Sequence, residues 1–528
     1  MATLSWAPVA GADTYYGQIL SPKASDWNFR PFATLYYAVL GRTAKLNYPV
    51  YVAVLQLLHI GNVVILFLLL RRFGFSWMAG AAAAVFYAFH VTTMEVYWKP
   101  MFVFDLLCAT LCLASLLLYV RGRWILALIP FWLAFKSKEI AVMLPVGLLA
   151  YEFLLGERRW KRLIPYFVIS LSFGVQAVVH NRAVAGIDTY ALHFSLSTVL
   201  ATIRFYSAAI LYLPDLWVAV LLLPLVVRDR RLLLGVILTA SLIAPLVLLP
   251  NRTLDAYWYT PMIGLAIVVA AVASRVPRWA VAAFFIVWLP AYFVLLREKR
   301  RDVLDDGVAM RNVVTSLQDY KRLTPPVQAV VFDNIPPRLH EWGVNGAIKV
   351  VFGHRVDAAY LRSSNAGDAM AKVPMALITF RNHGISGMVR HHDGIQSYAA
   401  FGQKVDESQF GEGCYNDGSS MRWFAPRAEV RFYRPPEATQ FEIVGFLPRE
   451  SIDKDGPAEV TLFEDGVSLG TVRLAAPVVQ PLRWMLPNGA PGDKHLTIVS
   501  KPARRGGATE DRELGISVES LGYLPLPM

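Results

Sequence analysis

The first 300 residues of this 528-residue chain contain ten apolar stretches, and these stretches constrain its fold more than any other feature. A helix needs about 20 apolar residues to cross a bilayer, and shorter stretches can be extended by their flanks or enclosed in a bundle. The sequence therefore predicts a polytopic α-helical membrane protein of about ten spans. The stretches are 48–70, 77–92, 100–120, 124–135, 140–155, 163–180, 205–227, 232–250, 258–274 and 278–296.

Basic residues follow every odd-numbered stretch, and this pattern predicts the orientation of the chain. Cytoplasmic loops carry an excess of Lys and Arg, so the five basic gaps face the cytoplasm. The net charge of +12 is then largely a signal of topology, and we expect no nucleic-acid partner. We place the protein in the inner membrane as a multi-pass protein. The basic groups are Arg71 and Arg72; Arg121 and Arg123; Arg158, Arg159, Lys161 and Arg162; Arg228, Arg230 and Arg231; and Arg275 and Arg278.

The same orientation divides the chain into four parts. Residues 1–47 form a first extracytoplasmic loop with a juxtamembrane helix, and residues 48–296 form the transmembrane bundle. Because the loop starts outside without a span of its own, we expect that a first transmembrane helix is missing before Met1. In the bundle, Pro214 and Asp215 predict a kink or a break within the stretch 205–227.

The soluble remainder is extracytoplasmic and has two predicted parts. Residues 297–410 read as an α/β region with strands at Gln328–Phe332, Ile348–Phe352 and Met375–Phe380. Residues 411–528 read as a β-sandwich, because short alternating strands follow one another between turns. Trp423 is a candidate sugar platform, although a place in the core is the simpler interpretation. The sandwich strands are Glu429–Tyr433, Gln440–Phe446, Glu459–Phe463 and Leu496–Ser500, with a hairpin turn at Glu464-Asp465-Gly466.

Ionisable side chains gather at the outer ends of the predicted spans. Charge at membrane depth is expensive and by default marks function. Lys136 and Lys138 break the positive-inside bias, which favours an anionic ligand such as a phosphate. The structural alternatives are that Lys138 and Glu139 pair internally and that Asp105 orients a neighbouring helix. The candidates are Asp13, Asp26 and Arg30; His90, Glu95, Lys99 and Asp105; Lys136, Lys138 and Glu139; and Arg252, Asp255, Tyr257 and Tyr259.

Three ordered motifs carry a resemblance to a known family. They are Trp27-Asn28-Phe29-Arg30-Pro31-Phe32 with the later His59 and Asn62; Phe86-Tyr87-Ala88-Phe89-His90 with Glu95 and Trp98; and Phe135-Lys136-Ser137-Lys138-Glu139 continuing to Pro145. Together they resemble the GT-C superfamily of membrane glycosyltransferases, and within it the bacterial protein O-mannosyltransferase-like and TMTC-type branch. The resemblance covers residues 25–160 well and 160–300 in general plan. Val91 stands where the branch usually has proline.

The resemblance implies a reaction and a set of roles. The donor would be a polyprenyl-phosphate-linked sugar, and the acceptor a hydroxyl of a protein, glycan or lipid at the outer face. Asp13 or Asp26 would be the catalytic base, and Arg30, Lys138 and Arg252 would hold the phosphate. Glu139 would fix Lys138, and Tyr257 and Tyr259 would contact the sugar. Lys136, His90 and Glu95 complete the expected substrate site, with no metal and no cofactor.

Two alternatives remain open at this stage. A transporter of lipid-linked glycans would share the polar outer face, but it should also carry ionisable groups along a path across the bilayer. A non-catalytic scaffold in envelope glycan assembly would use the β-sandwich to bind a partner. The gathering of charge on one side favours the enzyme over the transporter, and the position of the aspartates relative to Lys138 separates the enzyme from the scaffold.

Overall fold

The computed structural model divides the chain into two compact units, one of residues 6–305 and one of residues 1–5 with 306–528. The structure describes the chain apart from residues 1–2, 6, 11, 24–29, 184–191, 325, 382–383, 391–394, 402–404, 417–419, 506–511 and 526–528.

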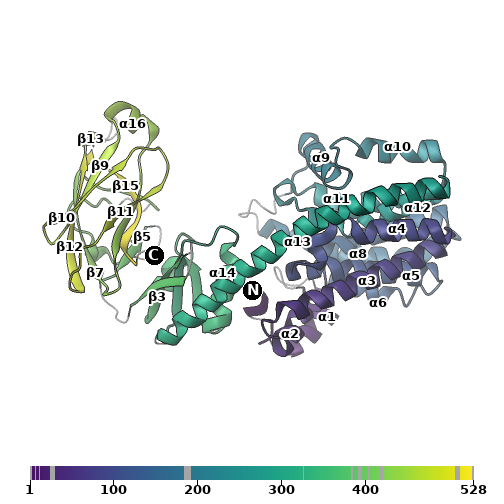
Figure 1. Cartoon of the computed structure of the whole chain (residues 1–528), viewed down its shortest axis with the longest axis horizontal. Coiled ribbons are helices and arrows are strands. Elements are labelled where there is room, and N and C mark those ends of the chain that lie inside the picture. Colours follow the sequence, from purple (N-terminus) through teal and green to yellow (C-terminus); the bar gives the residue numbers. More distant parts are fainter. Residues whose placement is uncertain are drawn as a thin grey trace. The chain divides into compact units, whose positions relative to one another are not determined.

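The first unit is built of helices, and several of the longest lie side by side (Figure 1). Helix α3 packs on α4 and α5, and α12 packs on both α4 and α11. The helices are α1 (Ala12–Leu20), α2 (Pro31–Thr43), α3 (Tyr48–Arg72), α4 (Trp77–Phe89), α5 (Val103–Val120), α6 (Leu128–Phe135), α7 (Leu144–Leu154), α8 (Ile164–Ala183), α9 (Leu196–Leu211), α10 (Trp217–Val227), α11 (Arg230–Val247), α12 (Met262–Ala273) and α13 (Arg278–Leu323), with short 3₁₀ turns η2 (Val91–Tyr97), η4 (Glu139–Met143), η7 (Pro250–Arg252) and η8 (Asp255–Trp258).

Within the described residues, four helices are long and apolar enough to cross a membrane. They include Tyr48–Arg72, Pro100–Val120 and Arg230–Val247, and the fourth, Arg278–Leu323, continues into the second unit. Four further apolar helices have 10–17 residues. The chain therefore has the helices of a membrane protein, but a count of about ten spans is not confirmed. The stretch 124–135 illustrates the reason, since only its last eight residues become α-helix.

The predicted break near Pro214 is confirmed. Helix α9 ends where Tyr212 adopts a left-handed conformation with φ 62°, and α10 begins at Trp217. The hydroxyl of Ser207 accepts a hydrogen bond from the Trp217 amide and donates one to the Leu213 carbonyl. These bonds satisfy backbone groups that the interrupted helix leaves without partners.

Two glycines allow α11 and α12 to approach closely. A Cβ atom added at Gly264 would lie 2.6 Å from the carbonyl oxygen of Gly235 and 2.5 Å from the amide of Thr239. A Cβ atom added at Gly235 would lie 2.8 Å from the Gly264 carbonyl. Small residues permit such backbone contact between membrane helices, where packing rather than hydrophobic burial drives association.

The second unit begins with an α/β layer. Its sheet has the order β2-β1-β3-β4, in which β1 (Ala329–Asp333) lies parallel to β2 (Asp357–Tyr360) and β3 (Met375–Arg381), and β4 (Gly384–Arg390) is antiparallel. The strand predicted at Ile348–Phe352 is wrong, because those residues form the end of helix α14 (Glu341–Phe352). Val344, Ala347 and Ile348 are buried at helical spacing, and a short apolar run alone does not distinguish a strand from a buried helix.

Most of the rest of this unit consists of two antiparallel sheets that share one core, here called the two-sheet region. A further two-stranded sheet pairs β13 (Arg504–Arg505) with β14 (Glu513–Leu514). Side chains of β7, β9 and β12 meet those of β8, β11 and β15 in that core. The strands predicted at 429–433, 440–446, 459–463 and 496–500 are confirmed, and Asp465-Gly466 form the expected turn. One sheet is β10 (Val467–Leu474), β9 (Ala458–Glu464), β12 (Gly492–Lys501) and β7 (Arg427–Arg434); the other is β11 (Gln480–Met485), β8 (Gln440–Phe446), β15 (Ser517–Leu524) and β5 (Tyr398–Ala400), with β6 (Arg422–Trp423) beside β15.

One residue of this region, Trp423, is a candidate from the sequence. Trp423 is half-buried and packs against the shared core rather than standing free on the surface. This placement agrees with the structural interpretation. Cys414 is a free cysteine at the margin of the same core.

Candidate functional site

Charged side chains from four separate segments meet at one end of the helical unit. Arg30 precedes α2, Asp105 lies in the first turn of α5, Lys138 and Glu139 join α6 to α7, and Arg252 and Tyr257 lie between α11 and α12. Contacts join Asp105, Lys138, Tyr257 and Arg252 in one group and Arg30 with Glu139 in another, and the two groups meet at the neighbouring residues Lys138 and Glu139. We refer to Arg30, Asp105, Lys138, Glu139, Arg252 and Tyr257 as the charged cluster.

The centre of the cluster is a buried ion pair. The Lys138 ammonium binds the Asp105 carboxylate, and only 11% and 7% of the two side chains are exposed. The ammonium also lies 4.1 Å from the centre of the Tyr257 ring, in a cation–π contact. Asp105 stands in the first helical turn, where the helix dipole stabilises negative charge. Removing one partner of a buried pair of this kind strongly destabilises the folded protein, because the other charge stays buried without a partner.

A second, more open ion pair adjoins the first. The Arg30 guanidinium donates from Nε and Nη2 to the two carboxylate oxygens of Glu139, each at 3.0 Å. The Glu139 side chain is 60% exposed and that of Arg30 19% exposed. Desolvation raises the pKa of the Glu139 carboxyl, but the charge and hydrogen bonds of Arg30, a backbone hydrogen bond and the charge of Lys138 together hold that pKa below its usual value. Glu139 is therefore ionised at neutral pH, and much of its side chain is exposed to solvent.

Tyr257 joins the third cation to the cluster. Arg252 donates from Nε to the Tyr257 hydroxyl at 2.8 Å, while the ring of the same tyrosine covers Lys138. Tyr257 is buried and Arg252 is half-buried. Tyr257 thus contacts two cations, one over its ring and one at its hydroxyl group.

Lys138 and Glu139 are neighbours in the chain, yet they bind different partners. The expectation that Glu139 would fix Lys138 is corrected by the structure, in which Asp105 holds Lys138 and Arg30 holds Glu139. The backbone of Lys138 is extended, with φ −164° and ψ 147°. Successive side chains of an extended backbone point to opposite sides, so the two residues reach different segments.

Asp105 is the residue that sequence reasoning left outside the predicted site. The sequence places it among the ionisable candidates, and the structural alternative is that it orients a neighbouring helix. The structure shows that it does so by binding Lys138 of the α6–α7 connection. The available signal was a lone carboxyl group at membrane depth, which requires a partner of opposite charge.

A neutral network joins helix α3 to the segment that carries Tyr257. His59 Nδ1 is 2.7 Å from the Tyr259 hydroxyl, and Asn62 donates to that hydroxyl at 3.1 Å. The His59 ring stacks on Tyr97 with 4.1 Å between ring centres. These bonds tie α3 to the segment that begins at η8, two residues from Tyr257.

Lys136 is buried but does not bind another member of the cluster. Its ammonium donates to the Lys23 carbonyl at 2.9 Å and lies near the rings of Trp132 and Phe173. Burial lowers its pKa to about 8. Trp132 donates to the Ile19 carbonyl at 2.8 Å, so α6 and the residue that follows it hold residues 19 and 23.

The remaining predicted residues that the structure describes have other surroundings. The His90 ring packs among aromatic side chains, including Phe86 and Tyr292. Glu95 pairs with Lys99 at 3.1 Å within one turn. Asp13 is exposed in the first turn of α1, and Asp26 lies outside the described residues. Among the described residues, no group of three or more His, Cys, Asp or Glu side chains could hold a metal ion.

Comparison with protein families and with curated proteins found no match to this chain. Among solved structures, the chain is similar to a single-particle cryo-electron microscopy structure of the arabinofuranosyltransferase AftD from Mycobacteria. The sequence identity is 11% and the TM-score 0.45, and the alignment covers 99% of this chain and 56% of that one. The chain thus spans about half the length of the protein it matches.

Proposed function

We propose that the protein is an integral membrane glycosyltransferase of the GT-C type, which moves a sugar from a polyprenyl-phosphate donor to a hydroxyl acceptor. The observation that carries this proposal is the charged cluster itself. Arg30, Lys138, Glu139, Arg252 and Tyr257 are each site candidates from sequence. Lys138 and Arg252 both contact Tyr257, Arg30 binds Glu139, and Lys138 and Glu139 are neighbours in the chain.

The cluster suits a phosphate leaving group. In the proposed reaction the acceptor oxygen bonds to the anomeric carbon, while the bond from that carbon to the phosphate oxygen breaks. The electron pair leaves with the polyprenyl phosphate, whose growing negative charge needs cations held in a low-dielectric site. Lys138, Arg30 and Arg252 supply three such cations, and their carboxylate and tyrosine partners hold them in place before substrate arrives.

The acceptor hydroxyl must lose a proton to a general base. We assign this role to Asp26, with Asp13 as the other candidate. The residues on either side of Asp26 support the assignment, because the Lys23 carbonyl binds Lys136 and the Arg30 side chain binds Glu139. Lys23 and Arg30, which precede and follow Asp26 in the sequence, are therefore both bound to the connection that carries Lys138.

The proposed orientation follows from the charges at the opposite end of the unit. The loops after α3, α5 and α7 carry exposed arginines, which marks them as cytoplasmic. The charged cluster then opens on the outer face of the inner membrane, where a lipid-linked donor and an extracytoplasmic acceptor can both reach it. The second unit lies on the same outer side in this proposal.

The experiment is a transfer assay in detergent with synthetic polyprenyl-phosphate sugars. We expect Lys138→Ala to lower kcat by at least about 100-fold, which is the usual effect of removing one group that stabilises developing negative charge. Lys138→Arg, which keeps the positive charge, should retain more activity than Lys138→Ala. The matched control is Lys161→Ala, an exposed cation of the opposite end, which should leave the rate unchanged.

Folding is checked for every variant by its thermal unfolding in the same detergent. A folded Lys138→Ala protein that transfers sugar at the wild-type rate would remove the cluster from the reaction. Loss of activity in Lys161→Ala as well would show that the assay reports general damage.

A second candidate function is a non-catalytic membrane scaffold. The observation that favours it is that Lys138 and Arg30 each have a carboxylate partner within the protein. A scaffold would show no transfer from any donor, and its Lys138→Ala variant would lose stability alone.

A further inference from the structure

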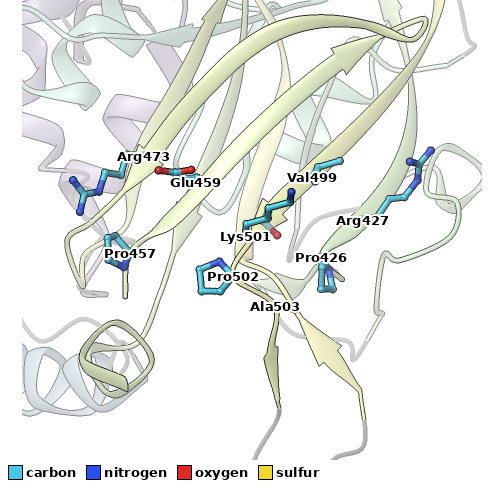
Figure 2. A pocket seen from close by; sticks show the side chains of 10 residues that line it. Pro426, Arg427, Pro457, Glu459, Arg473, Val499, Lys501, Pro502 and Ala503 are labelled. Atoms are coloured by element: carbon cyan, nitrogen blue, oxygen red, sulfur yellow. The ribbon is translucent and has the colours of Figure 1, made fainter. Parts of the chain in front are cut away.

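The two-sheet region carries an open hollow of about 750 Å³ on the outer face of the sheet β10-β9-β12-β7 (Figure 2). Four charged side chains line it: Arg427, Glu459, Arg473 and Lys501. All four are exposed, and they alternate along their strands with the buried residues of the core. The charged side chains therefore face away from the core that joins the two sheets.

The strand register fixes how these charges are arranged. Glu459 stands directly opposite Arg473 on one side and Lys501 on the other, while Arg427 stands opposite Val499 at the far strand. Figure 2 shows Arg473 and Arg427 at opposite margins, with Lys501 between them. Adjacent strands are about 4.8 Å apart, so the row of cations spans roughly 14 Å across the sheet.

The rim of the hollow is built of prolines. Pro426 precedes β7, Pro457 precedes β9 and Pro502 follows β12, and all three line the hollow. Because the ring of proline fixes the backbone angle φ, the ends of three neighbouring strands are held in shape before any ligand binds. Arg427 pairs with Glu429 at 3.3 Å. In the described part of the chain, the ion pairs of this region do not include Glu459, Arg473 or Lys501, so these three groups are available to a ligand.

We propose that this hollow binds an acidic polysaccharide, a sugar chain that carries carboxylate or phosphate groups at intervals. The spacing of the cations requires a ligand with several separated negative charges rather than one small anion. Glu459 in the middle of the row would repel a densely charged polyphosphate, but it can accept hydrogen bonds from sugar hydroxyls. The lining contains no aromatic ring on which nucleic-acid bases could stack.

A flat anionic membrane is a poorer match for the same surface. The cations border a recess with a carboxylate in its centre, whereas a lipid headgroup layer favours a continuous basic surface. A membrane is therefore an outcome that the test must distinguish.

The test measures binding to the full chain in nanodiscs of neutral lipid. The probes are galacturonate hexasaccharide, which is acidic, and maltohexaose, which is neutral. We expect the acidic probe to bind and the neutral probe to bind at least tenfold more weakly. Arg473→Ala with Lys501→Ala should lower the affinity for the acidic probe at least tenfold. The matched control is Arg449→Ala with Lys454→Ala, which removes two exposed cations of helix α16 (Arg449–Asp455) elsewhere on the same region.

Three results would overturn the proposal. They are equal binding of both probes, unchanged affinity in the Arg473→Ala and Lys501→Ala variant, and an equal loss in the control variant. Vesicles with 30% phosphatidylglycerol serve as the competing ligand, and stronger binding to vesicles that depends on Arg473 and Lys501 would assign the hollow to the membrane surface instead. Each comparison is made only between variants with the same unfolding temperature. The result is independent of sugar transfer by the charged cluster, so either proposal can fail alone.

Discussion

The two ends of the helical unit both carry cations, but they hold them in different ways. At one end, Arg71, Arg72, Arg121, Arg123 and Arg158 are exposed. At the other end, Lys136 and Lys138 are buried, with 1% and 9% of each residue exposed. Exposed basic residues at helix ends orient a membrane protein, whereas buried ones cost free energy and need a compensating partner or a function. The difference locates the candidate site at the second end.

The carboxylates show the same contrast. Asp229 at the arginine-rich end pairs with Arg231 at 2.8 Å and Arg275 at 3.7 Å, and it also accepts a backbone bond at the start of α11. It therefore caps a helix and joins two connections. In the charged cluster, Glu139 is paired with Arg30 but remains 60% exposed. The arginine-rich end therefore buries its carboxylate Asp229, whereas the end with the charged cluster leaves the carboxylate of Glu139 exposed.

The largest expected effect concerns the two candidate bases. We expect Asp26→Asn to lower the rate of sugar transfer by at least about 100-fold, because the general base would be lost. We expect Asp13→Asn to change the rate little. The reason for the difference is that Lys23 and Arg30, on either side of Asp26 in the sequence, bind residues of the α6–α7 connection that carries Lys138. The initial rate of transfer measures both. Inactivity of Asp13→Asn together with full activity of Asp26→Asn would reverse the assignment.

Removing one partner of the buried pair should have the next largest effect. We expect Asp105→Ala to lower the free energy of unfolding by about 3–5 kcal/mol, since it leaves the Lys138 ammonium buried without a counter-charge. Denaturant titration in detergent measures this change. The double variant Asp105→Leu with Lys138→Met should recover most of the lost stability, and failure to recover it would show that packing rather than charge dominates the site.

A substitution in the close contact between α11 and α12 should have a smaller effect on stability, and this effect does not involve charge. Gly264→Ala should lower the free energy of unfolding by about 1–3 kcal/mol, because its methyl group would overlap the Gly235 carbonyl. The control is Gly61→Ala in α3, where a Cβ atom meets no atom within 4 Å. An equal effect of both substitutions would point to helix propensity or detergent rather than to the close contact.

The smallest expected effect is the coupling between Arg30 and Glu139. Because Glu139 is 60% exposed, a double-mutant cycle with Arg30→Gln and Glu139→Gln should give a coupling energy of at most about 1 kcal/mol. The same single variants should lower sugar transfer more than they lower stability. Coupling as strong as that of Asp105 with Lys138 would show that the outer pair is structural.

Local patterns in the sequence predicted part of the structure well. The break at Pro214 and the strands around 440–446 follow from residue types that disrupt or favour a single element. The segment Ile348–Phe352 was assigned to the wrong element, since a five-residue run with four apolar residues fits either a strand or the buried face of a helix. The predicted count of about ten spans depends on the apolar composition of each stretch. Composition does not fix the residue at which a helix begins, and the stretch 124–135 becomes α-helix only from Leu128.

The candidate site shows a different limit. Residue type and position in the chain were enough to select Arg30, Lys138 and Arg252. Their partners depend on how distant helices pack and on the extended backbone at Lys138, and neither is encoded in a local pattern. Sequence reasoning therefore paired Lys138 with its neighbour Glu139 and left Asp105 aside.

The most direct test of the central claim is whether the charged cluster recognises a lipid-borne phosphate. The measurement is the affinity of the purified protein for synthetic polyprenyl phosphate and for the corresponding polyprenyl alcohol, in wild type and in the Asp105→Leu with Lys138→Met variant. We predict that wild type binds the phosphate at least tenfold more tightly than the alcohol and that the variant, once shown to be folded, loses this preference. Equal affinity for the two lipids in wild type, or a preference that survives in the variant, would contradict the account.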